Sequence, residues 1–204
     1  MSLKNKIRLF FEYKIKKPIK FFRRNLIIKR NFPKGVIVDG DYKKIFIGTN
    51  TIIEPGVVLS IVLSGKITIG NNCEIRRGTI ISTHGGDIVI GNSCSLNPYC
   101  VIYGMGGLKI DDYVRIATHT SIVPSNHRID SIDELIINQG LSKIGIKINK
   151  NVWIGAGVVI LDGTVINEGV VVAAGAVVKG IIKKNTVIGG IPAKIIKYRQ
   201  NNIK

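Results

Sequence analysis

The chain has 204 residues, of which 45% are hydrophobic and 6% aromatic, and it carries a net charge of +17. Its length suits one domain with short appendages, and it contains no run of about 18 apolar residues, so we expect no transmembrane helix. The first residues lack an uninterrupted apolar core with a small-residue cleavage site, which argues against a secretory signal. The apolar residues are mostly Ile and Val, which favour strands over helices.

The positive charge is confined to the two ends of the chain. Residues 1–34 hold 12 Lys and Arg against one Glu, and residues 179–204 hold seven Lys and Arg with no acidic residue. Residues 35–178 hold 11 basic and 12 acidic residues, so the central body is nearly neutral. The charge therefore characterises appendages. Because no nucleic-acid-binding motif accompanies it, we expect no nucleic-acid partner.

Residues 1–34 form a basic segment with the pattern of an amphipathic helix. Leu3, Ile7 and Phe10 fall on one helical stripe, while Lys and Arg lie elsewhere and Pro18 interrupts the pattern. Such a helix can lie on a membrane surface or bind a partner. It can also cap the open end of a repetitive fold. Both interpretations stay open.

From Ile47 onward an aliphatic residue returns at every sixth position. The pattern begins with IGTNTI and IEPGVV and resumes at Ile69, Ile90 and Ile110. From Ile148 it runs unbroken through INKNVW, IGAGVV, ILDGTV, INEGVV and VAAGAV. Gly and Asn are frequent between the aliphatic residues, where tight turns need unusual backbone angles. A period of six fits neither an α-helix nor one long alternating strand.

This period is typical of a solenoid made of short strands. Three hexapeptides make one triangular coil, each coil stacks on the next, and the aliphatic residues form a continuous ladder inside. We therefore predict an all-β solenoid over residues 35–191, followed by a short basic tail over residues 192–204. An ordinary β-sandwich does not predict a period of six.

The repeat is interrupted once, over residues 123–147. This segment reads VPSNHRIDSIDELIINQGLSKIGIK; it begins with turn-forming residues and contains His127, and Ile148 restarts the repeat after it. A solenoid tolerates an insertion that leaves a coil at a corner and returns, and long insertions of this kind are commonly functional. We predict a projecting loop that carries the chemistry. The alternative is that His127 is only an exposed polar residue.

The sequence from about residue 47 to residue 197 resembles the hexapeptide-repeat acyltransferases. The segment NKNVWIGAGVVILDGTVINEGVVVAAGAVV, followed by VIGGIPAKIIKYR, is similar to the branch that acetylates sugars and polysaccharide precursors, including the galactoside and maltose acetyltransferases. The resemblance implies a left-handed parallel β-helix, a homotrimer and a cytoplasmic enzyme without a required metal. It implies acetyl transfer from acetyl-CoA to a hydroxyl of a sugar or cell-surface polysaccharide precursor. A membrane-binding N-terminal segment would place the enzyme at the inner face of a membrane.

The same resemblance implies the catalytic and acceptor residues. His127 matches the general base, because an imidazole can take the proton of a hydroxyl as its oxygen attacks the thioester. Asn97, in LNPYCV, matches an Asn that contacts the acceptor, although an Asn in a solenoid turn can be purely structural. Glu134 and Asp133 can orient the imidazole or the acceptor, or can be solvated charges. We expect the acceptor between two subunits.

The donor contacts implied by the resemblance lie on the late coils. Small residues let a long, thin CoA molecule approach the backbone, and those expected at its pantetheine arm are Gly155, Ala156 and Ala174. Small residues are also needed at coil corners for packing alone.

Three lysines are expected at the nucleotide end of CoA. Lys194 and Lys197, in PAKIIK, match cations for the CoA phosphates, and a compact ammonium group is a sensible phosphate partner. Lys179 matches a polar or basic contact to the nucleotide. It is followed by Gly180, whereas the family commonly has a Thr-Lys pair here, which puts the Lys179 contact in doubt.

Three other functions compete with O-acetylation. Within the same enzyme class, the alternative is N-acetylation of an amino sugar, which can be linked to a nucleotide. A zinc enzyme similar to the gamma-class carbonic anhydrases would use His84, His119 and His127, but His119 and His127 are eight residues apart, whereas two ligands in that class are five apart. The third is a non-catalytic trimeric scaffold.

The three cysteines predict no disulfide. Cys73, Cys94 and Cys100 are odd in number and follow no CxxC spacing. We expect reduced thiols that fill small inward positions of the solenoid.

Overall fold

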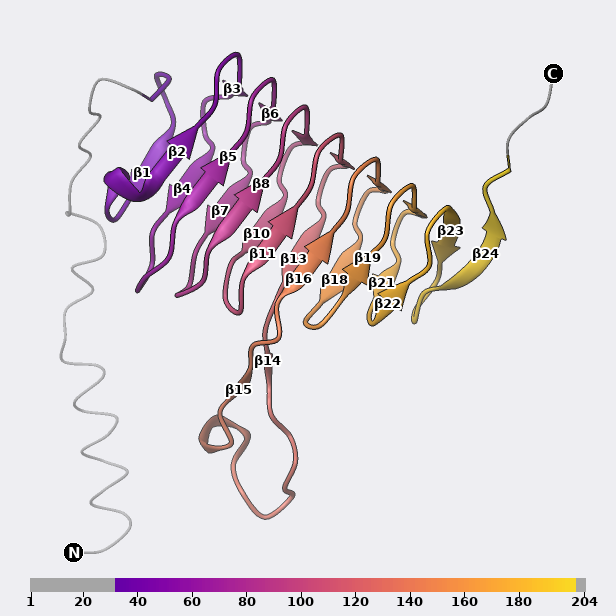
Figure 1. The fold of residues 1–204 in the computed structure, drawn as a ribbon. Coiled ribbons are helices and arrows are strands. Elements are labelled where there is room, and N and C mark those ends of the chain that lie inside the picture. Colours follow the sequence, from indigo (N-terminus) through magenta and orange to yellow (C-terminus); the bar gives the residue numbers. More distant parts are fainter. Residues whose placement is uncertain (1–31, 201–204) are drawn as a thin grey trace, which may run out of the picture.

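The chain winds into a parallel β-solenoid from which one loop projects (Figure 1). The structure is a computed structural model that describes residues 32–200. Nearly all of the basic segment, including the stripe expected to be helical, lies outside these residues. Within them the regular structure is almost entirely β-strand, so the prediction of an all-β parallel solenoid is confirmed.

Three sheets form the walls of the solenoid, and the chain visits them in turn. Sheet 1 contains β1 (Ile37–Asp39), β4 (Val58–Ser60), β7 (Ile80–Ser82), β10 (Val101–Tyr103), β13 (Ser121–Val123), β18 (Val159–Leu161) and β21 (Val177–Val178). Sheet 2 contains β2 (Ile45–Ile47), β5 (Ile67–Ile69), β8 (Ile88–Ile90), β11 (Leu108–Ile110), β16 (Ile146–Ile148), β19 (Val165–Ile166) and β22 (Ile181–Ile182). Sheet 3 contains β3 (Ile52–Ile53), β6 (Glu74–Ile75), β9 (Ser95–Leu96), β12 (Arg115–Ile116), β17 (Trp153–Ile154), β20 (Val171–Val172), β23 (Thr186–Gly189) and the antiparallel β24 (Lys194–Tyr198).

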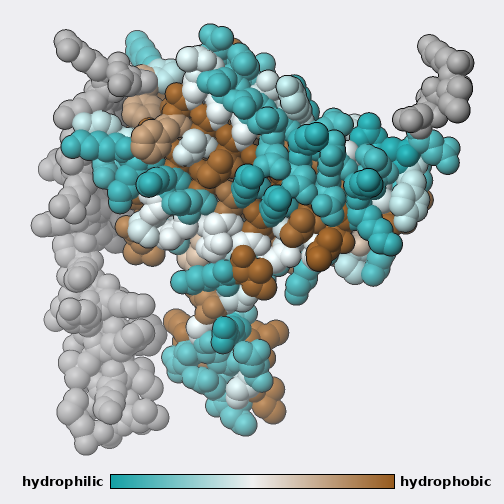
Figure 2. All heavy atoms as spheres, in the orientation of Figure 1, coloured by the Kyte–Doolittle hydropathy of each residue, from teal (hydrophilic) through white to brown (hydrophobic). Residues whose placement is uncertain are grey.

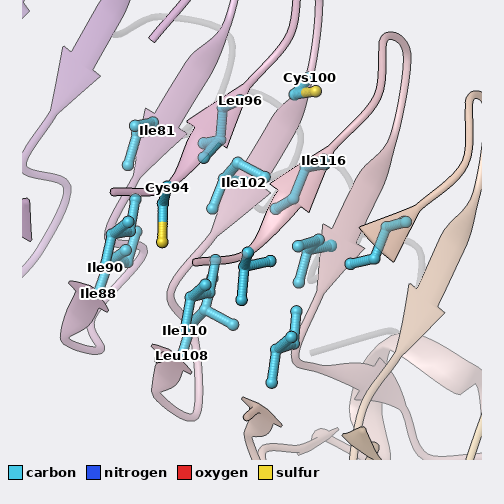
Figure 3. Close-up of a cluster of buried hydrophobic side chains, with 14 of the residues drawn as sticks. Ile81, Ile88, Ile90, Cys94, Leu96, Cys100, Ile102, Leu108, Ile110 and Ile116 are labelled. Atoms are coloured by element: carbon cyan, nitrogen blue, oxygen red, sulfur yellow. The ribbon is translucent and has the colours of Figure 1, made fainter. Parts of the chain in front are cut away.

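The ladder of aliphatic residues is the core. One in-register column of sheet 1 is completely buried and consists of Leu59, Ile81, Ile102, Ile122 and Ile160. Figure 3 shows residues of this kind from neighbouring coils pointing into one continuous interior. Burying a side chain of this size contributes about 1.5–3 kcal/mol. Because every coil repeats this contribution, the narrow solenoid is stable without a thick core.

The walls meet at three corners, named here by the sheets that they join. Corner A joins sheet 3 to sheet 1 and consists of residues 54–57, 76–79, 97–100, 117–120, 155–158 and 173–176. Corner B joins sheet 1 to sheet 2 and consists of residues 40–44, 61–66, 83–87, 104–107, 124–145, 162–164 and 179–180. Corner C joins sheet 2 to sheet 3 and consists of residues 48–51, 70–73, 91–94, 111–114, 149–152, 167–170 and 183–185.

The turn residues of corners A and C adopt left-handed backbone angles, as the Gly and Asn pattern predicts. The third residue of each corner has a positive φ, for example 55° at Asn50 and 66° at Gly157. Asn and Gly tolerate this region at low cost. The hexapeptide therefore encodes a short strand, a left-handed turn and a return into the next wall.

Corner B departs from the strict period. Ile45 pairs with Ile67, 22 residues later, whereas Lys147 pairs with Val165, 18 residues later. The extra residues of the early coils lie in corner B, which shortens from six residues at 61–66 to three at 162–164. Coils of three hexapeptides are thus found only after the loop. The loop itself leaves from this same corner, where the solenoid already accommodates insertions.

The three cysteines are buried and unpaired, as predicted. The Sγ atoms of Cys73, Cys94 and Cys100 each donate a hydrogen bond to a backbone carbonyl of the following coil, at 3.1–3.2 Å. Burial raises the pKa of the Cys100 thiol to about 11. The Cys100 thiol is therefore a packing group that is held in its protonated form.

Candidate active site

His127 lies on a small hairpin at the start of the projecting loop. The strand β14 (Asn126–His127) pairs with β15 (Leu141–Ser142) in antiparallel register, so that His127 faces Leu141. The backbone N–H of Arg128 extends this ladder by donating to the carbonyl of Gly140 at 3.0 Å. The imidazole is exposed. The loop thus spans residues 124–145, within the predicted 123–147, and its strands β14 and β15 project from the wall of the solenoid (Figure 1).

Asp162 attaches the returning end of the loop to the solenoid. Its side chain, in the next coil of corner B, is only 3% exposed. The carboxylate accepts hydrogen bonds from Ser142 Oγ at 2.6 Å and from the backbone N–H groups of Ile144 and Gly145, both at 2.9 Å. Burial by itself would raise the pKa of Asp162, but these donors outweigh it and hold the pKa below its usual value.

This contact determines where the hairpin starts. Ser142 is paired with Asn126, the neighbour of His127, so the Asp162 carboxylate holds β15, the partner of the strand that carries the imidazole. Asp162 was not predicted from the sequence. Its only signal is an acidic residue directly before a turn glycine in ILDGTV, a pattern that solvated turns share.

Gln139 organises the distal part of the loop. Its Oε1 accepts from the N–H of Ser131 at 3.0 Å, and its Nε2 donates to the carbonyls of Ser131 and Glu134, both at 2.8 Å. The residues around this network include a turn of 3₁₀-helix, η3 (Ile136–Asn138). Gln139 was also not predicted, because a single Gln in a polar loop has no distinguishing pattern.

The structure gives the His127 imidazole no orienting carboxylate within one chain. In the described residues, no hydrogen bond or ion pair joins it to Asp133 or Glu134. Glu134 uses its backbone carbonyl to accept from Gln139, and its carboxylate is exposed. The proposed roles of Asp133 and Glu134 therefore stay predictions.

The loop exposes an unusual amount of apolar surface. Figure 2 shows hydrophobic residues on its flanks and tip. The exposed fractions run from 54% to 99% for Ile129, Ile132, Leu135, Ile136, Ile137 and Ile144. So many exposed aliphatic side chains on one loop favour contact with another protein surface.

Asn97, which is predicted to contact the acceptor, is the first residue of the corner A turn at 97–100. Its Nδ2 donates to the carbonyl of Ile116 at 3.0 Å, which links two coils. The side chain is half-buried, and in the described residues its Oδ1 has no hydrogen-bond partner. Asn97 therefore supports the wall with one end of its amide and presents an acceptor oxygen with the other.

The small residues expected at CoA lie on the same corner, two and three coils later. Gly155 is buried, Ala156 is half-buried and Ala174 is exposed. A Cβ at Gly155 would lie 2.6 Å from the backbone N of Ala174. Neither Ala156 N–H nor Ala174 N–H donates a hydrogen bond within the described residues. A side chain at Gly155 would crowd the backbone N of Ala174, so glycine leaves room beside this donor.

The three lysines expected at CoA are divided between two places. Lys194 and Lys197 lie on the exposed strand β24, where Lys194 is paired with Gly189. A Cβ at Gly189 would lie 2.9 Å from Cβ of Ala173, so this part of β24 is close to the last coil of corner A. Lys179 lies in corner B instead. The structure therefore groups two of the lysines with the small residues and separates the third.

His127 and the donor residues belong to different edges of the same chain. Sheet 1 separates corner A from corner B, and its strand β13 has three residues, which span roughly 10 Å at 3.3 Å per residue. The projecting loop carries His127 further from the wall. One chain thus supplies a base at one edge and a small-residue surface at another.

The three histidines do not gather into a metal site within the chain. The His84 ring packs against Tyr103 with a centroid distance of 4.4 Å in corner B, and His119 stacks on Tyr99 in corner A. In residues 32–200, no group of three His, Cys, Asp or Glu side chains is placed to hold a metal ion. The geometry gives the zinc alternative no support within one chain.

The late coils of the solenoid match a known protein family. The family described as bacterial transferase hexapeptide (six repeats) matches residues 145–180. The matched segment contains β16 to β21, where the coils consist of three hexapeptides. It also contains the small residues of corner A that were predicted to contact CoA.

Curated relatives extend this match over most of the chain. An Escherichia coli dTDP-4-amino-4,6-dideoxy-D-glucose acyltransferase is 32% identical over 143 residues, covering 68% of this chain and 74% of the relative. WbbJ of Escherichia coli K12, whose name describes a lipopolysaccharide biosynthesis O-acetyl transferase, is 32% identical over 148 residues, covering 69% and 76%. Rv3034c of Mycobacterium tuberculosis, whose name describes an acetyltransferase, is 32% identical over 135 residues, which are 66% of this chain and only 45% of that relative.

A solved structure of similar fold binds CoA. AntD, an N-acyltransferase from Bacillus cereus, was solved as a point mutant in complex with dTDP and coenzyme A. It superposes with a TM-score of 0.66 at 28% sequence identity, over 77% of this chain and 85% of AntD. The repeat, the solenoid and two relatives covered over about three quarters of their length agree. The chain belongs to the hexapeptide-repeat acyltransferase family.

Proposed function

We propose that the protein transfers an acetyl group from acetyl-CoA to a hydroxyl of a sugar or cell-surface polysaccharide precursor, with His127 as the general base. The observation that carries this proposal is the separation of two complementary parts. Corner B presents an exposed imidazole on a hairpin, and corner A presents two backbone N–H groups that have no partner within the described residues, among small side chains. Each part lacks what the other supplies.

We further propose that the two parts meet in a homotrimer, between neighbouring subunits. The outer face of sheet 1 supports this arrangement, because one in-register column on it is apolar except for Ser121 and consists of Ile37, Val58, Ile80, Val101, Ser121, Val159 and Val177. The equivalent column of sheet 2 also contains apolar residues, but Thr68, Lys109 and Lys147 interrupt it. Packing on sheet 1 would also cover apolar side chains of the loop, which favours association.

The chemistry follows from the two parts. The acceptor oxygen attacks the thioester carbon while the His127 imidazole takes its proton. Backbone N–H groups such as those of Ala156 and Ala174 could stabilise the negative charge that develops on the carbonyl oxygen. The carbon–sulfur bond then breaks, and the imidazolium returns its proton to the departing CoA thiolate. Asn97 and the loop residue Glu134 are the proposed acceptor contacts.

Acetyl-CoA is the proposed donor. Gly155, Ala156 and Ala174 would contact its pantetheine arm. Lys194 and Lys197 are exposed on β24 beside the last coil of corner A, which suits contacts to phosphates. Lys179, on corner B, could reach a CoA molecule only on a neighbouring subunit.

A second candidate function is N-acylation of an amino sugar linked to a nucleotide. The Escherichia coli relative that acts on a dTDP-amino sugar and the AntD structure with bound dTDP support it, as WbbJ supports O-acetylation. Both reactions would use the same donor site. The two functions differ only in the nucleophile of the acceptor.

The described residues contain no helix that is long and apolar enough to cross a membrane. We propose a cytoplasmic enzyme that works at the inner face of a membrane when its acceptor is lipid-linked. The support is the basic segment 1–34, because clustered Lys and Arg are attracted to anionic lipid surfaces.

A transfer assay tests the proposal. The full chain is incubated with radiolabelled acetyl-CoA and matched acceptors that differ only in a hydroxyl or an amino group, and wild type is compared with His127→Ala. We expect His127-dependent acetylation of the hydroxyl acceptors and a trimeric mass by light scattering. Acetylation of amino acceptors alone would establish the second candidate, whereas no CoA binding would contradict both.

A further inference from the structure

Two aromatic side chains are stacked on the outside of corner A. Tyr99 and His119 are the third residues of the corner A turns in two successive coils. Their ring centroids are 5.3 Å apart and their ring planes differ by 13°. Both side chains are exposed. The spacing follows the solenoid, because hydrogen-bonded strands lie about 4.8 Å apart. The rings therefore form a short column parallel to the solenoid axis.

This column is covered at one end and open at the other. In the preceding coil, a Cβ at Gly78 would lie 2.4 Å from Cδ1 of Tyr99, so the Tyr99 ring covers that glycine. In the coil after His119 the equivalent residue is Gly157, and a Cβ there would have no atom within 4 Å. The next place in the column, beside the His119 ring, is thus open.

Backbone geometry gives no reason for aromatic residues here. Tyr99 has a φ of 63°, in the left-handed region that bulky residues rarely adopt, and His119 has a φ of 59° in the same region. Four other coils place glycine at this position, namely at Gly56, Gly78, Gly157 and Gly175. Stability alone would favour Gly or Asn, and side chains kept in such conformations cluster at ligand sites.

The neighbours of the column connect it to the proposed reaction. Asn97, the proposed acceptor contact, is two residues before Tyr99 in the same coil. Ala156, the proposed donor contact, directly precedes Gly157. A planar or ring-shaped group over Gly157 would continue the stack between these two contacts.

We propose that the open face of His119, supported by Tyr99, binds a ring of the acceptor: the pyranose of a glycan or the nucleobase of a sugar nucleotide. This inference rests on the proposed acetyl transfer and specifies how that site recognises its acceptor. Both kinds of ring present a face that can stack on an imidazole. Stacking of a base on an aromatic side chain changes affinity by roughly five- to a hundredfold.

Saturation-transfer NMR on the full chain tests this proposal with two probes, methyl α-D-glucopyranoside and thymidine. The variants are His119→Asn and Tyr99→Asn, because Asn accepts the left-handed turn without strain. The matched control is Tyr113→Asn. Tyr113 has a φ of 62° and is 59% exposed, but it lies in corner C, and no ring stacks on it within the described residues.

We expect ring-proton signals from at least one probe that fall at least fivefold in His119→Asn, fall less in Tyr99→Asn and are unchanged in Tyr113→Asn. A stronger glucoside signal identifies a glycan acceptor, and a stronger thymidine signal identifies a sugar nucleotide. The absence of any His119-dependent signal, or an equal loss in the control, overturns the proposal.

A further variant separates this proposal from the proposed function. His127→Ala should abolish acetyl transfer and leave the probe signals unchanged. If His119→Asn transfers acetyl with the wild-type acceptor KM, the stacking site is wrong while the transfer reaction stands. If no variant, nor the wild type, transfers acetyl, a His119-dependent probe signal still supports the binding site.

Discussion

The wall of the solenoid and the loop that leaves it use hydrophobic residues in opposite ways. In the wall, the inward-pointing aliphatic side chains of each coil are buried, and Ile102 and Ile122 are fully inaccessible. In the loop, residues of the same kind are exposed, and Ile132 is 99% exposed. The wall stabilises itself coil by coil, whereas the loop is held to it by polar contacts such as those of Asp162.

This difference separates stability from chemistry. The Ile, Val and Gly residues that build the wall have no group that can take a proton, and their repetition makes the wall rigid. The loop carries the imidazole but buries too little apolar surface to order itself independently. The apolar side chains that it exposes suggest that a neighbouring subunit completes its packing. The following substitutions test this division, from the largest expected effect to the smallest.

Replacing the base should cost the most activity and no stability. His127→Ala should lower kcat by about 10²- to 10⁴-fold, the usual contribution of a general base, while the melting temperature and CoA affinity stay at the wild-type values. The control is Asn126→Ala, an exposed neighbour in the same strand. A loss smaller than about tenfold would show that another group takes the proton.

Matched truncations in the wall and in the loop should have opposite effects. Ile102→Ala removes a fully buried side chain and should lower the free energy of unfolding by about 2–5 kcal/mol. Ile132→Ala, in the loop, should leave unfolding of the solenoid unchanged and weaken self-association. Denaturant titration and light scattering measure the two effects. Equal destabilisation by both variants would abolish the distinction between wall and loop.

Removing the anchor of the loop should loosen the loop and spare the wall. Asp162→Ala removes the acceptor of three part-buried hydrogen bonds, each of which contributes about 0.5–1.5 kcal/mol, so hydrogen exchange should accelerate over residues 124–145. Exchange in β10 and β11 should not change. Ser142→Ala, which removes one donor only, should show a smaller effect in the same segment. Acceleration along the whole chain would contradict a local anchor.

The same contact predicts a pH dependence. Because the pKa of Asp162 is lowered in the folded state, its contribution to stability is full above the unfolded-state value of about 3.9 and is lost as the pH falls through the lowered pKa. Loop exchange, compared at equal intrinsic rates, should therefore accelerate below about pH 4 in the wild type. In Asp162→Asn this acid dependence should disappear.

The smallest effect is expected at the proposed phosphate contacts. Lys194→Ala should raise the KM for acetyl-CoA about two- to fivefold, because an exposed ion pair contributes about 0.2–1 kcal/mol. Lys184→Ala, an exposed lysine of corner C, is the control and should have no effect. High salt should reduce the difference between wild type and Lys194→Ala. If both substitutions raise the KM for acetyl-CoA equally, the cause is the loss of overall positive charge and not of a specific phosphate contact.

The sequence predicts the wall better than the site. Its period reveals the buried ladder, as at Ile148 and Ile154, and its turn residues reveal the left-handed corners. The position of the loop around His127 follows from the break in the same pattern. Asp162 and Gln139 could not be predicted, because their roles depend on backbone groups 5 to 18 residues away that only the fold brings close.

The sequence alone determined the architecture, because a repeat of six residues allows one local structure in every coil and each coil binds only its neighbours. The resemblance also indicated the kind of chemistry. Tertiary structure decided which corner each residue occupies: it placed Asn97, His119 and Ala174 on one edge and Lys179 and the His127 hairpin on another. The period specifies the position of a side chain within its coil, but only the stacking of coils joins residues into a common edge.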